Sequence, residues 1–270
     1  MAEYIHIADI GCRELEVYWK LTENQLKNRL DPQKGLFIAQ TGKVIALGLE
    51  AGFEPVSILA EEESLSRESR SILNQVGDIP VYVGSRDQLR QLTGFALTRG
   101  ILCAMRRKPL PSAREILSHA RRVAVLDGVV DGTNVGAIFR SAAALSMDAV
   151  LVSSTCCDPL NRRALRVSMG TVFKIPWTEV SSEELTEVLK SQGFRTCAMA
   201  LRENTISISD PVLKREEKLA VLLGSEGWGL SEDKISSCDY TVKIPMGHGV
   251  DSLNVAAASA VAFWELAKQN

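Results

Sequence analysis

Three glycine-rich segments, each with small polar or charged side chains, contain the residue types in this chain best suited to chemistry. They span Asp131–Arg140, Leu223–Ser231 and Thr241–Asn254. Glycine lets the backbone come close to a ligand, and the polar side chains can then hold or polarise it. Each segment follows a strand-like apolar run, so the three predict ligand-binding loops at strand ends.

The third segment passes from a strand-like stretch into an Ala-rich helical stretch. Its loop contains Gly247 and Gly249 and is loose enough to bring the backbone close to a ligand. Ser252 and Asn254 follow at the start of the helix, where backbone N–H groups are unpaired. Alone, this pattern predicts a general strand–loop–helix ligand site.

The first segment is expected to form a helix over Asn134–Leu145, because its apolar residues recur at helical spacing. Arg140 projects from roughly the opposite face, where a solvated arginine is the simple alternative to a functional one. Asn134 is placed to cap the helix and to reach neighbouring groups. The apolar stripe consists of Val135, Ile138, Phe139, Ala142 and Leu145.

The second segment has three glycines within six residues, which suits an approach to adenine or ribose. Glu226 is its one charged residue. It is either a functional side chain or, more simply, an exposed Glu in a glycine-rich turn. Trp228 is interpreted as a lid or interface residue rather than as one that stacks on a base. The chain has no G-x-x-x-x-G-K-[ST] loop, and this segment is not G-x-G-x-x-G, so common phosphate-loop and dinucleotide folds are disfavoured.

Strands and helices alternate on both sides of Arg106–Ser112, a basic stretch with two prolines that reads as a linker. We predict an α/β protein with domains at 1–105 and 114–270, joined by 106–113, and a mostly parallel second sheet. Residues from 112 onward are expected to fold and bind their ligand alone. The expected strands are 36–40, 55–60, 80–83, 100–105, 123–126, 149–153, 195–201, 219–223 and 240–244. The expected helices are 44–51, 66–76, 86–92, 134–145, 162–169, 182–192, 231–236 and 253–268.

Composition excludes some classes and leaves others open. No apolar run approaches the ~20 residues of a membrane span. The six cysteines form no C-x-x-C pair, which disfavours a zinc site and favours reduced, cytoplasmic thiols. The formal net charge is −2, so the chain lacks the excess of basic residues that many nucleic-acid binders carry. Basic clusters at 106–108, 121–122 and 162–166 are most simply solvated faces, with phosphate contact as the alternative.

In their order and spacing, the three segments resemble the signature of the SpoU branch of the SPOUT RNA methyltransferases, over essentially all of residues 120–268. The resemblance implies a C-terminal trefoil-knotted domain that binds S-adenosylmethionine, and a homodimer without metal or membrane partners. Residues 1–105 resemble a ribosomal-protein-like RNA-binding domain in size and element order alone. That domain would choose the RNA, with ribosomal RNA favoured.

The resemblance also assigns roles to individual residues. It implies that Arg166 and Arg163 contact RNA phosphate. The family's usual proline near Gly132 is missing here, although Asn134 and Arg140 stay in register. The implied catalytic residues are Arg140, Asn134, Glu226, Ser252 and Asn254. The implied cofactor-binding residues are Met199, Ala200, Leu201, Leu223, Gly224, Glu226, Gly229, Ile244, Met246, Ser252, Leu253 and Asn254.

Methyl transfer from a sulfonium to a ribose 2′-hydroxyl requires alignment of the two groups and removal of a proton. Arginine is effectively always protonated, so Arg140 is not expected to be a simple base. Either an RNA phosphate held by Arg140 or the carboxylate of Glu226 takes the proton. Other readings are a transfer-RNA 2′-O-methyltransferase, a base methyltransferase of the same superfamily, and a non-catalytic RNA-binding or ribosome-assembly factor.

Overall fold

The computed structural model describes residues 3–64, 71–94 and 100–267, which form two compact units. Unit 1 comprises Met1–Pro109 and Leu160–Phe173, and unit 2 comprises Leu110–Pro159 and Lys174–Asn270. The chain thus leaves unit 1 within the predicted linker but returns to it for one short segment. The sequence places that segment in the second domain, and the domain ranges stay a prediction.

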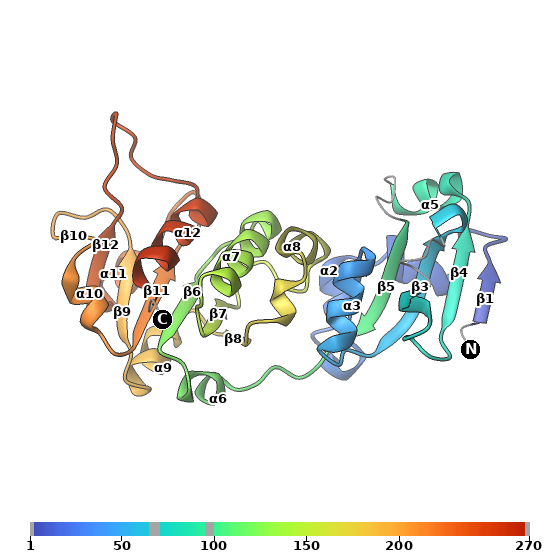
Figure 1. Cartoon of the computed structure of the whole chain (residues 1–270), viewed down its shortest axis with the longest axis horizontal. Coiled ribbons are helices and arrows are strands. Elements are labelled where there is room, and N and C mark those ends of the chain that lie inside the picture. Colours follow the sequence, from blue (N-terminus) through green and yellow to red (C-terminus); the bar gives the residue numbers. More distant parts are fainter. Residues whose placement is uncertain (1–2, 65–70, 95–99, 268–270) are drawn as a thin grey trace. The chain divides into compact units, whose positions relative to one another are not determined.

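Unit 1 contains a five-stranded mixed sheet in the order β1-β4-β3-β5-β2 (Figure 1). Strands β1, β4 and β3 run parallel, whereas β5 pairs antiparallel with both β3 and β2. The strands are β1 (Glu3–His6), β2 (Leu36–Gln40), β3 (Pro55–Glu61), β4 (Pro80–Gly84) and β5 (Ile101–Arg106). The helices are α1 (Glu16–Trp19), α2 (Glu23–Lys27), α3 (Gly42–Glu50), α5 (Arg86–Thr93) and α8 (Arg162–Ser168).

Successive residues of a strand face opposite sides of the sheet, so unit 1 buries apolar side chains on both faces. Ile38 of β2 packs in a cluster with residues of α1, α2 and α5, whereas its neighbour Phe37 belongs to an aromatic group. The Phe37 ring lies 5.2 Å from that of Phe53, and the Phe53 ring lies 5.1 Å from that of Phe173. Phe173 therefore ties the returning segment to unit 1.

The basic cluster at 106–108 is engaged within unit 1. Arg107 Nε donates to Leu36 O at 3.0 Å, and Lys108 Nζ donates to Ala51 O at 2.7 Å. Lys108 also lies 4.8 Å from the centre of the Phe53 ring, a cation–π contact. These two charges therefore hold the end of β5 and the start of the linker against the sheet.

Unit 2 contains a seven-stranded, fully parallel sheet in the order β10-β12-β9-β11-β6-β7-β8. The strands are β6 (Arg122–Leu126), β7 (Ala149–Ser153), β8 (Trp177–Val180), β9 (Arg195–Met199), β10 (Ile206–Ser207), β11 (Leu219–Leu223) and β12 (Tyr240–Lys243). The helices are α6 (Ala113–Ser118), α7 (Gly132–Ala144), α9 (Leu185–Ser191), α10 (Pro211–Arg215), α11 (Glu232–Ser237) and α12 (Val255–Leu266).

Helices cover both faces of this sheet, as its continuous buried strands require. Leu117 of α6, Leu189 of α9 and Ile235 of α11 share one core cluster with the strands. On the other face α7 and α12 lie side by side (Figure 1). Arg122, which is 2% exposed, anchors the end of α12 because its Nε donates to Leu266 O at 2.8 Å.

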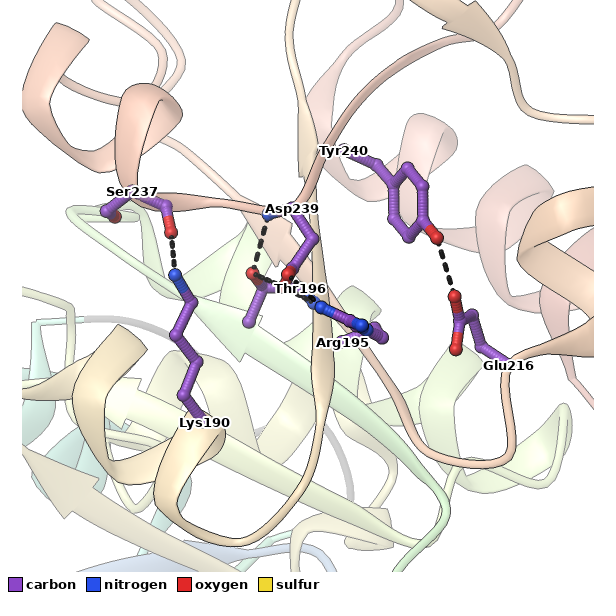
Figure 2. A network of polar contacts seen from close by, with 7 residues as sticks. All are labelled: Lys190, Arg195, Thr196, Glu216, Ser237, Asp239 and Tyr240. Carbon is purple, nitrogen blue, oxygen red and sulfur yellow. Dashed lines mark hydrogen bonds and ion pairs between the residues drawn. The ribbon is translucent and has the colours of Figure 1, made fainter.

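A polar network joins β9 and β12 at the ends where these strands begin (Figure 2). The Asp239 carboxylate accepts hydrogen bonds from Thr196 N at 2.9 Å, Thr196 Oγ1 at 2.8 Å and Arg195 Nη1 at 2.8 Å. Tyr240 Oη donates to Glu216 Oε1 at 2.5 Å, and Lys190 Nζ donates to Ser237 O at 2.5 Å. The network links the first residues of β9 to the residue before β12.

The predicted bounds of β2, β7 and β11 are confirmed, and other expected elements shift at their ends. Strand β9 ends two residues before the expected Leu201, and β12 ends at Lys243. Helix α7 begins at Gly132 and α12 at Val255. Of the expected helix at 66–76, residues 66–70 lie outside the described residues, 71–73 are helical and 74–76 are not. The short strands β1, β8 and β10 are not among the strands expected from the sequence.

Candidate active site

A pocket of about 530 Å³ opens where β9, β11 and β12 end. These strands are neighbours in the parallel sheet, so their carboxyl ends meet at one edge, where such folds bind ligands. The last residue of each strand, Met199, Leu223 and Lys243, lines the pocket. Its volume falls within the ~300–1,000 Å³ range of small-molecule sites.

All twelve residues expected to bind the cofactor line this pocket, while their individual roles stay a prediction. The loops after β9, β11 and β12 converge there because the parallel strands place them together. The twelve are Met199, Ala200, Leu201, Leu223, Gly224, Glu226, Gly229, Ile244, Met246, Ser252, Leu253 and Asn254. Lining residues that the sequence did not single out include Arg202, Lys243 and Asp251, and Trp228 lines the pocket as well.

The loop after β11 closes on itself. Ser225 and Gly229 exchange backbone hydrogen bonds of 3.2 and 3.0 Å, so residues 225–229 form a tight turn. A Cβ atom on Gly224 would lie 2.3 Å from Gly229 C and 2.4 Å from Leu230 N. Only glycine fits at position 224, because any side chain there would collide with backbone atoms of the same loop.

A chain of three side chains connects the loops to α7. Asn254 Nδ2 donates to Asn134 Oδ1 at 3.2 Å, and Asn134 Nδ2 donates to Glu226 Oε1 at 2.6 Å. Asn134 is buried, whereas Glu226 and Asn254 are exposed and line the pocket. The Glu226 carboxylate is thus held through one oxygen by a buried amide.

Asn134 does not cap its helix, contrary to the sequence interpretation. The cap of α7 is Asp131, whose Oδ1 accepts a hydrogen bond from Thr133 N at 2.7 Å. The helix begins two residues earlier than expected, so Asn134 sits within the first turn and its amide is available to Glu226 and Asn254. At the start of α12, Asn254 does serve as the cap and accepts from Ala256 N at 2.9 Å.

Arg140 is not among the residues that line the pocket. It lies on the exposed face of α7, opposite the buried stripe that includes Val135, Ile138 and Phe139. Ser252 does line the pocket, together with the Glu226 and Asn254 side chains. The structure therefore gathers four of the five predicted catalytic residues in or beside the pocket and leaves the fifth on a neighbouring surface.

Arg163 and Arg166 lie elsewhere. Both are exposed on α8, within the segment that packs with unit 1. Their neighbour Arg162 points inward and its Nη2 donates to Tyr18 O at 3.2 Å. Burial lowers the pKa of Arg162, with Glu23 opposing that shift. The two exposed arginines stay predicted phosphate contacts.

The pocket carries charges of both signs. Its lining includes the acidic Glu226 and Asp251 and the basic Lys243 and Arg202. Arg202 is paired with Glu232 through two guanidinium nitrogens. Over residues 3–64, 71–94 and 100–267, no group of three or more His, Cys, Asp or Glu is placed to hold a metal ion. In the same ranges, no helix is long and apolar enough to cross a membrane.

Comparison with known proteins identifies relatives of the chain. The sequence pattern of the SpoU rRNA Methylase family matches residues 121–264. An uncharacterized tRNA/rRNA methyltransferase of Mycobacterium bovis is 42% identical over 236 residues, covering 86% of this chain and 81% of the relative. A 23S rRNA (guanosine-2′-O-)-methyltransferase of Acinetobacter baylyi is 30% identical over 200 residues, covering 71% and 79%.

Solved structures share the fold. The AdoMet-bound rRNA methyltransferase from Sinorhizobium meliloti superposes with a TM-score of 0.82 at 18% identity, covering 97% of both chains. The SpoU methyltransferase AviRb from Streptomyces viridochromogenes gives 0.78 at 24% identity, covering 94% of this chain and 96% of its own. These identities show the α/β fold alone.

Proposed function

The chain belongs to the SpoU rRNA methylase family, and on that premise we propose that it methylates a ribose 2′-hydroxyl of ribosomal RNA. It is an RNA methyltransferase of the SpoU/TrmH type, and its cofactor is S-adenosylmethionine. The observation that carries the proposal is the chain from Asn254 through Asn134 to Glu226, because it holds a carboxylate at the edge of a nucleoside-sized pocket.

The pocket residues suit this cofactor. Met199, Leu223 and Ile244 offer apolar wall for an adenine, and the bare backbone at Gly224 allows close approach. Ser252 and Asp251 supply polar groups for the ribose and amino-acid parts. When bound, the cofactor supplies an electrophilic methyl group on a sulfonium.

The residues around the pocket orient the acceptor and move its proton. Asn134 fixes one oxygen of Glu226, so the other is available to accept the proton of the ribose hydroxyl. Arg140 stays protonated, so it polarises the hydroxyl oxygen or holds an RNA phosphate that accepts the proton in its turn. Glu226 is the proton acceptor in the first route and the phosphate in the second, and both routes need Arg140 at the pocket.

We place Arg140 at the pocket of a partner subunit in a homodimer. The outward face of α12 carries Ala257, Val261 and Trp264 at spacings of four and three residues, and all three are exposed. This apolar stripe runs beside α7, which bears Arg140. Pairing of α12 helices would cover the stripe, and tryptophan is favoured in such interfaces. The trefoil knot is proposed with it, supported by the family and by the long loop before α12.

Ribosomal RNA is proposed over transfer RNA for two reasons. The Acinetobacter baylyi relative is named for 23S rRNA and aligns over more of this chain than unit 2 holds. In addition, unit 1 has its own sheet and core, as a separate RNA-binding domain would.

The six free cysteines are in keeping with a reducing, cytoplasmic location.

The reaction can be tested with radiolabelled cofactor and RNA from cells that lack the gene. Alkaline hydrolysis leaves a 2′-O-methylated nucleotide in an uncleaved dinucleotide, whereas a methylated base appears in a mononucleotide. We expect label in dinucleotides from ribosomal RNA. Label in mononucleotides, or in transfer RNA alone, would show that the acceptor or the substrate is wrong.

The shared site can be tested by mixing two inactive variants. Arg140→Ala and Asn254→Ala subunits are each expected to be inactive alone. A mixed dimer would hold one doubly altered site and one intact site, so refolding the two together should restore part of the activity. If mixed dimers form and stay inactive, Arg140 acts within its own chain.

A further inference from the structure

Trp228 is the most exposed aromatic side chain among the described residues, at 95%. It lies in the turn after β11 and borders the pocket. Two further large apolar residues that line the same pocket are exposed on other loops, Leu201 at 48% and Leu253 at 39%. Exposed apolar side chains from three loops thus line the pocket.

The turn holds Trp228 in a fixed position. Its backbone N donates to Ser225 Oγ at 3.3 Å, inside the pair of bonds between Ser225 and Gly229. The neighbours Gly227 and Gly229 have no side chains, and a Cβ atom at either would meet nothing within 4 Å. The indole is 95% exposed and so has open faces, while its backbone is held by the turn.

A flat aromatic ring with open sides at the edge of a nucleoside pocket suits a flat, unpaired ligand. We propose that Trp228 stacks against an unpaired base of the RNA substrate and so positions the strand for methyl transfer. The inference rests on the proposed function and adds to it a single-stranded target. RNA bases that are unstacked from a helix are commonly recognised on aromatic side chains.

A second copy of this chain is the other possible occupant. Stable protein interfaces need roughly 1,200–2,000 Å² of buried surface with a contiguous apolar centre. Within the turn at residues 225–229, Trp228 is accompanied by two glycines, Ser225 and the charged Glu226, and the exposed Leu201 and Leu253 belong to separate loops. The contiguous apolar stripe lies on α12 instead, so the base is the occupant that this turn favours.

The position of Trp228 can be read by fluorescence. Acrylamide quenching is measured for the wild type, Trp228→Phe and Trp264→Phe, with a 12-nucleotide single-stranded RNA or an abasic strand of the same length. We expect the RNA to protect the wild type and Trp264→Phe from quenching, and to protect Trp228→Phe much less. The abasic strand should protect none of them.

Kinetics supply the second readout. Because Trp228 is exposed, Trp228→Ala should fold normally. We expect it to lower kcat/KM for ribosomal RNA roughly 5- to 150-fold, the range of one lost base stack, mainly through KM. Trp228→Phe should keep most of the activity because a phenyl ring still stacks.

Three results would overturn the inference. The first is an unchanged kcat/KM in Trp228→Ala. The second is a loss of S-adenosylmethionine affinity, measured by calorimetry, that equals the loss of kcat/KM. The third is a change of oligomeric state in sedimentation. The second would place the indole over the cofactor, and the third would place it against a second copy. If the wild type methylates no RNA, the proposed function fails, while the fluorescence experiment still decides whether Trp228 stacks on a base.

Discussion

Asn254 and Asn134 lie 120 residues apart in sequence and are joined by a side-chain hydrogen bond of 3.2 Å. The same Asn254 side chain caps α12 through Ala256 N. Asn134 passes the connection on to Glu226 over 2.6 Å. The Asn254 side chain therefore both caps α12 and orients Asn134, the residue that holds the Glu226 carboxylate.

Substitutions at Asn254 can separate these two roles. Asn254→Asp keeps an oxygen for Ala256 N but turns a second acceptor toward Asn134 Oδ1. We expect a melting temperature close to wild type and at least a tenfold loss of methyl transfer. Asn254→Ala should lose the activity and also about 0.5–2 kcal/mol of stability, the usual cost of a lost cap. A fully active Asn254→Asp enzyme would show that the bond to Asn134 is dispensable.

Gly224 and Gly227 make a matched pair for the turn after β11. Gly224→Ala puts a methyl group 2.3 Å from Gly229 C, so the turn must open and cofactor affinity should fall at least tenfold in calorimetry. Gly227→Ala adds the same methyl group into open space and should fold with an unchanged melting temperature. Equal cofactor affinity in Gly224→Ala and wild type would contradict the close packing of this loop.

Arg140 should matter for transfer and not for cofactor binding, because it lies off the pocket wall. Arg140→Ala is expected to bind S-adenosylmethionine within about twofold of wild type and to lose methyl transfer. Arg140→Lys should also be poor, since lysine lacks the planar two-point contact of a guanidinium. Calorimetry and a transfer assay measure both, and a parallel loss of cofactor affinity would contradict the assigned role.

The sequence predicted which loops line the pocket, but it did not predict the hydrogen bond between Asn134 and Glu226. Strand ends at Leu223 and near Met199 could be placed from apolar runs, and parallel pairing then brings their loops together. The bond between Asn134 and Glu226 spans 92 residues and depends on where α7 begins. Because Asp131 is also a good cap, the sequence does not decide between a start at Gly132 and one at Asn134.

The sequence pattern did not predict the short strand β8 or the return of residues 160–173 to unit 1. Strand β8 has four residues, follows a proline and contains Glu179, so its apolar period is too weak to detect. Helix α8 lies in the sequence between elements of unit 2 but packs with unit 1, for example through Arg162 Nη2, which donates to Tyr18 O. Helical periodicity identifies which face of α8 is apolar, and it does not say which sheet that face covers.

The returning segment changes the expectation for a truncated chain. Residues 112–270 alone would keep Phe173 but lose Phe37 and Phe53, which lie 5.9 and 5.1 Å from its ring. We therefore expect this fragment to bind a hydrophobic dye and to unfold less cooperatively than the full chain, contrary to the expectation of independent folding. A sharp thermal transition with no dye binding would show that Leu160–Phe173 needs no support from residues 1–109.

Asp239 should make stability depend on acid. Burial alone would raise the pKa of its carboxyl, but hydrogen bonds from Thr196 and Arg195 outweigh this and lower it. A lowered folded pKa stabilises the protein above the ordinary value near ~4, and that contribution is lost as pH falls through the folded value. Asp239→Asn should cost about 1–3 kcal/mol at pH 7 and less at pH 3, by denaturant unfolding. A pH-independent difference would contradict this.

The central claim is tested most directly by mapping 2′-O-methyl sites in total RNA. Cells with the gene, without it, and with Arg140→Ala in its place are compared by resistance of each ribose to alkaline cleavage. We predict a ribosomal RNA site that is methylated in the first, absent in the second and absent in the third. Identical 2′-O-methyl maps in all three would contradict the assignment of this chain as a ribose methyltransferase.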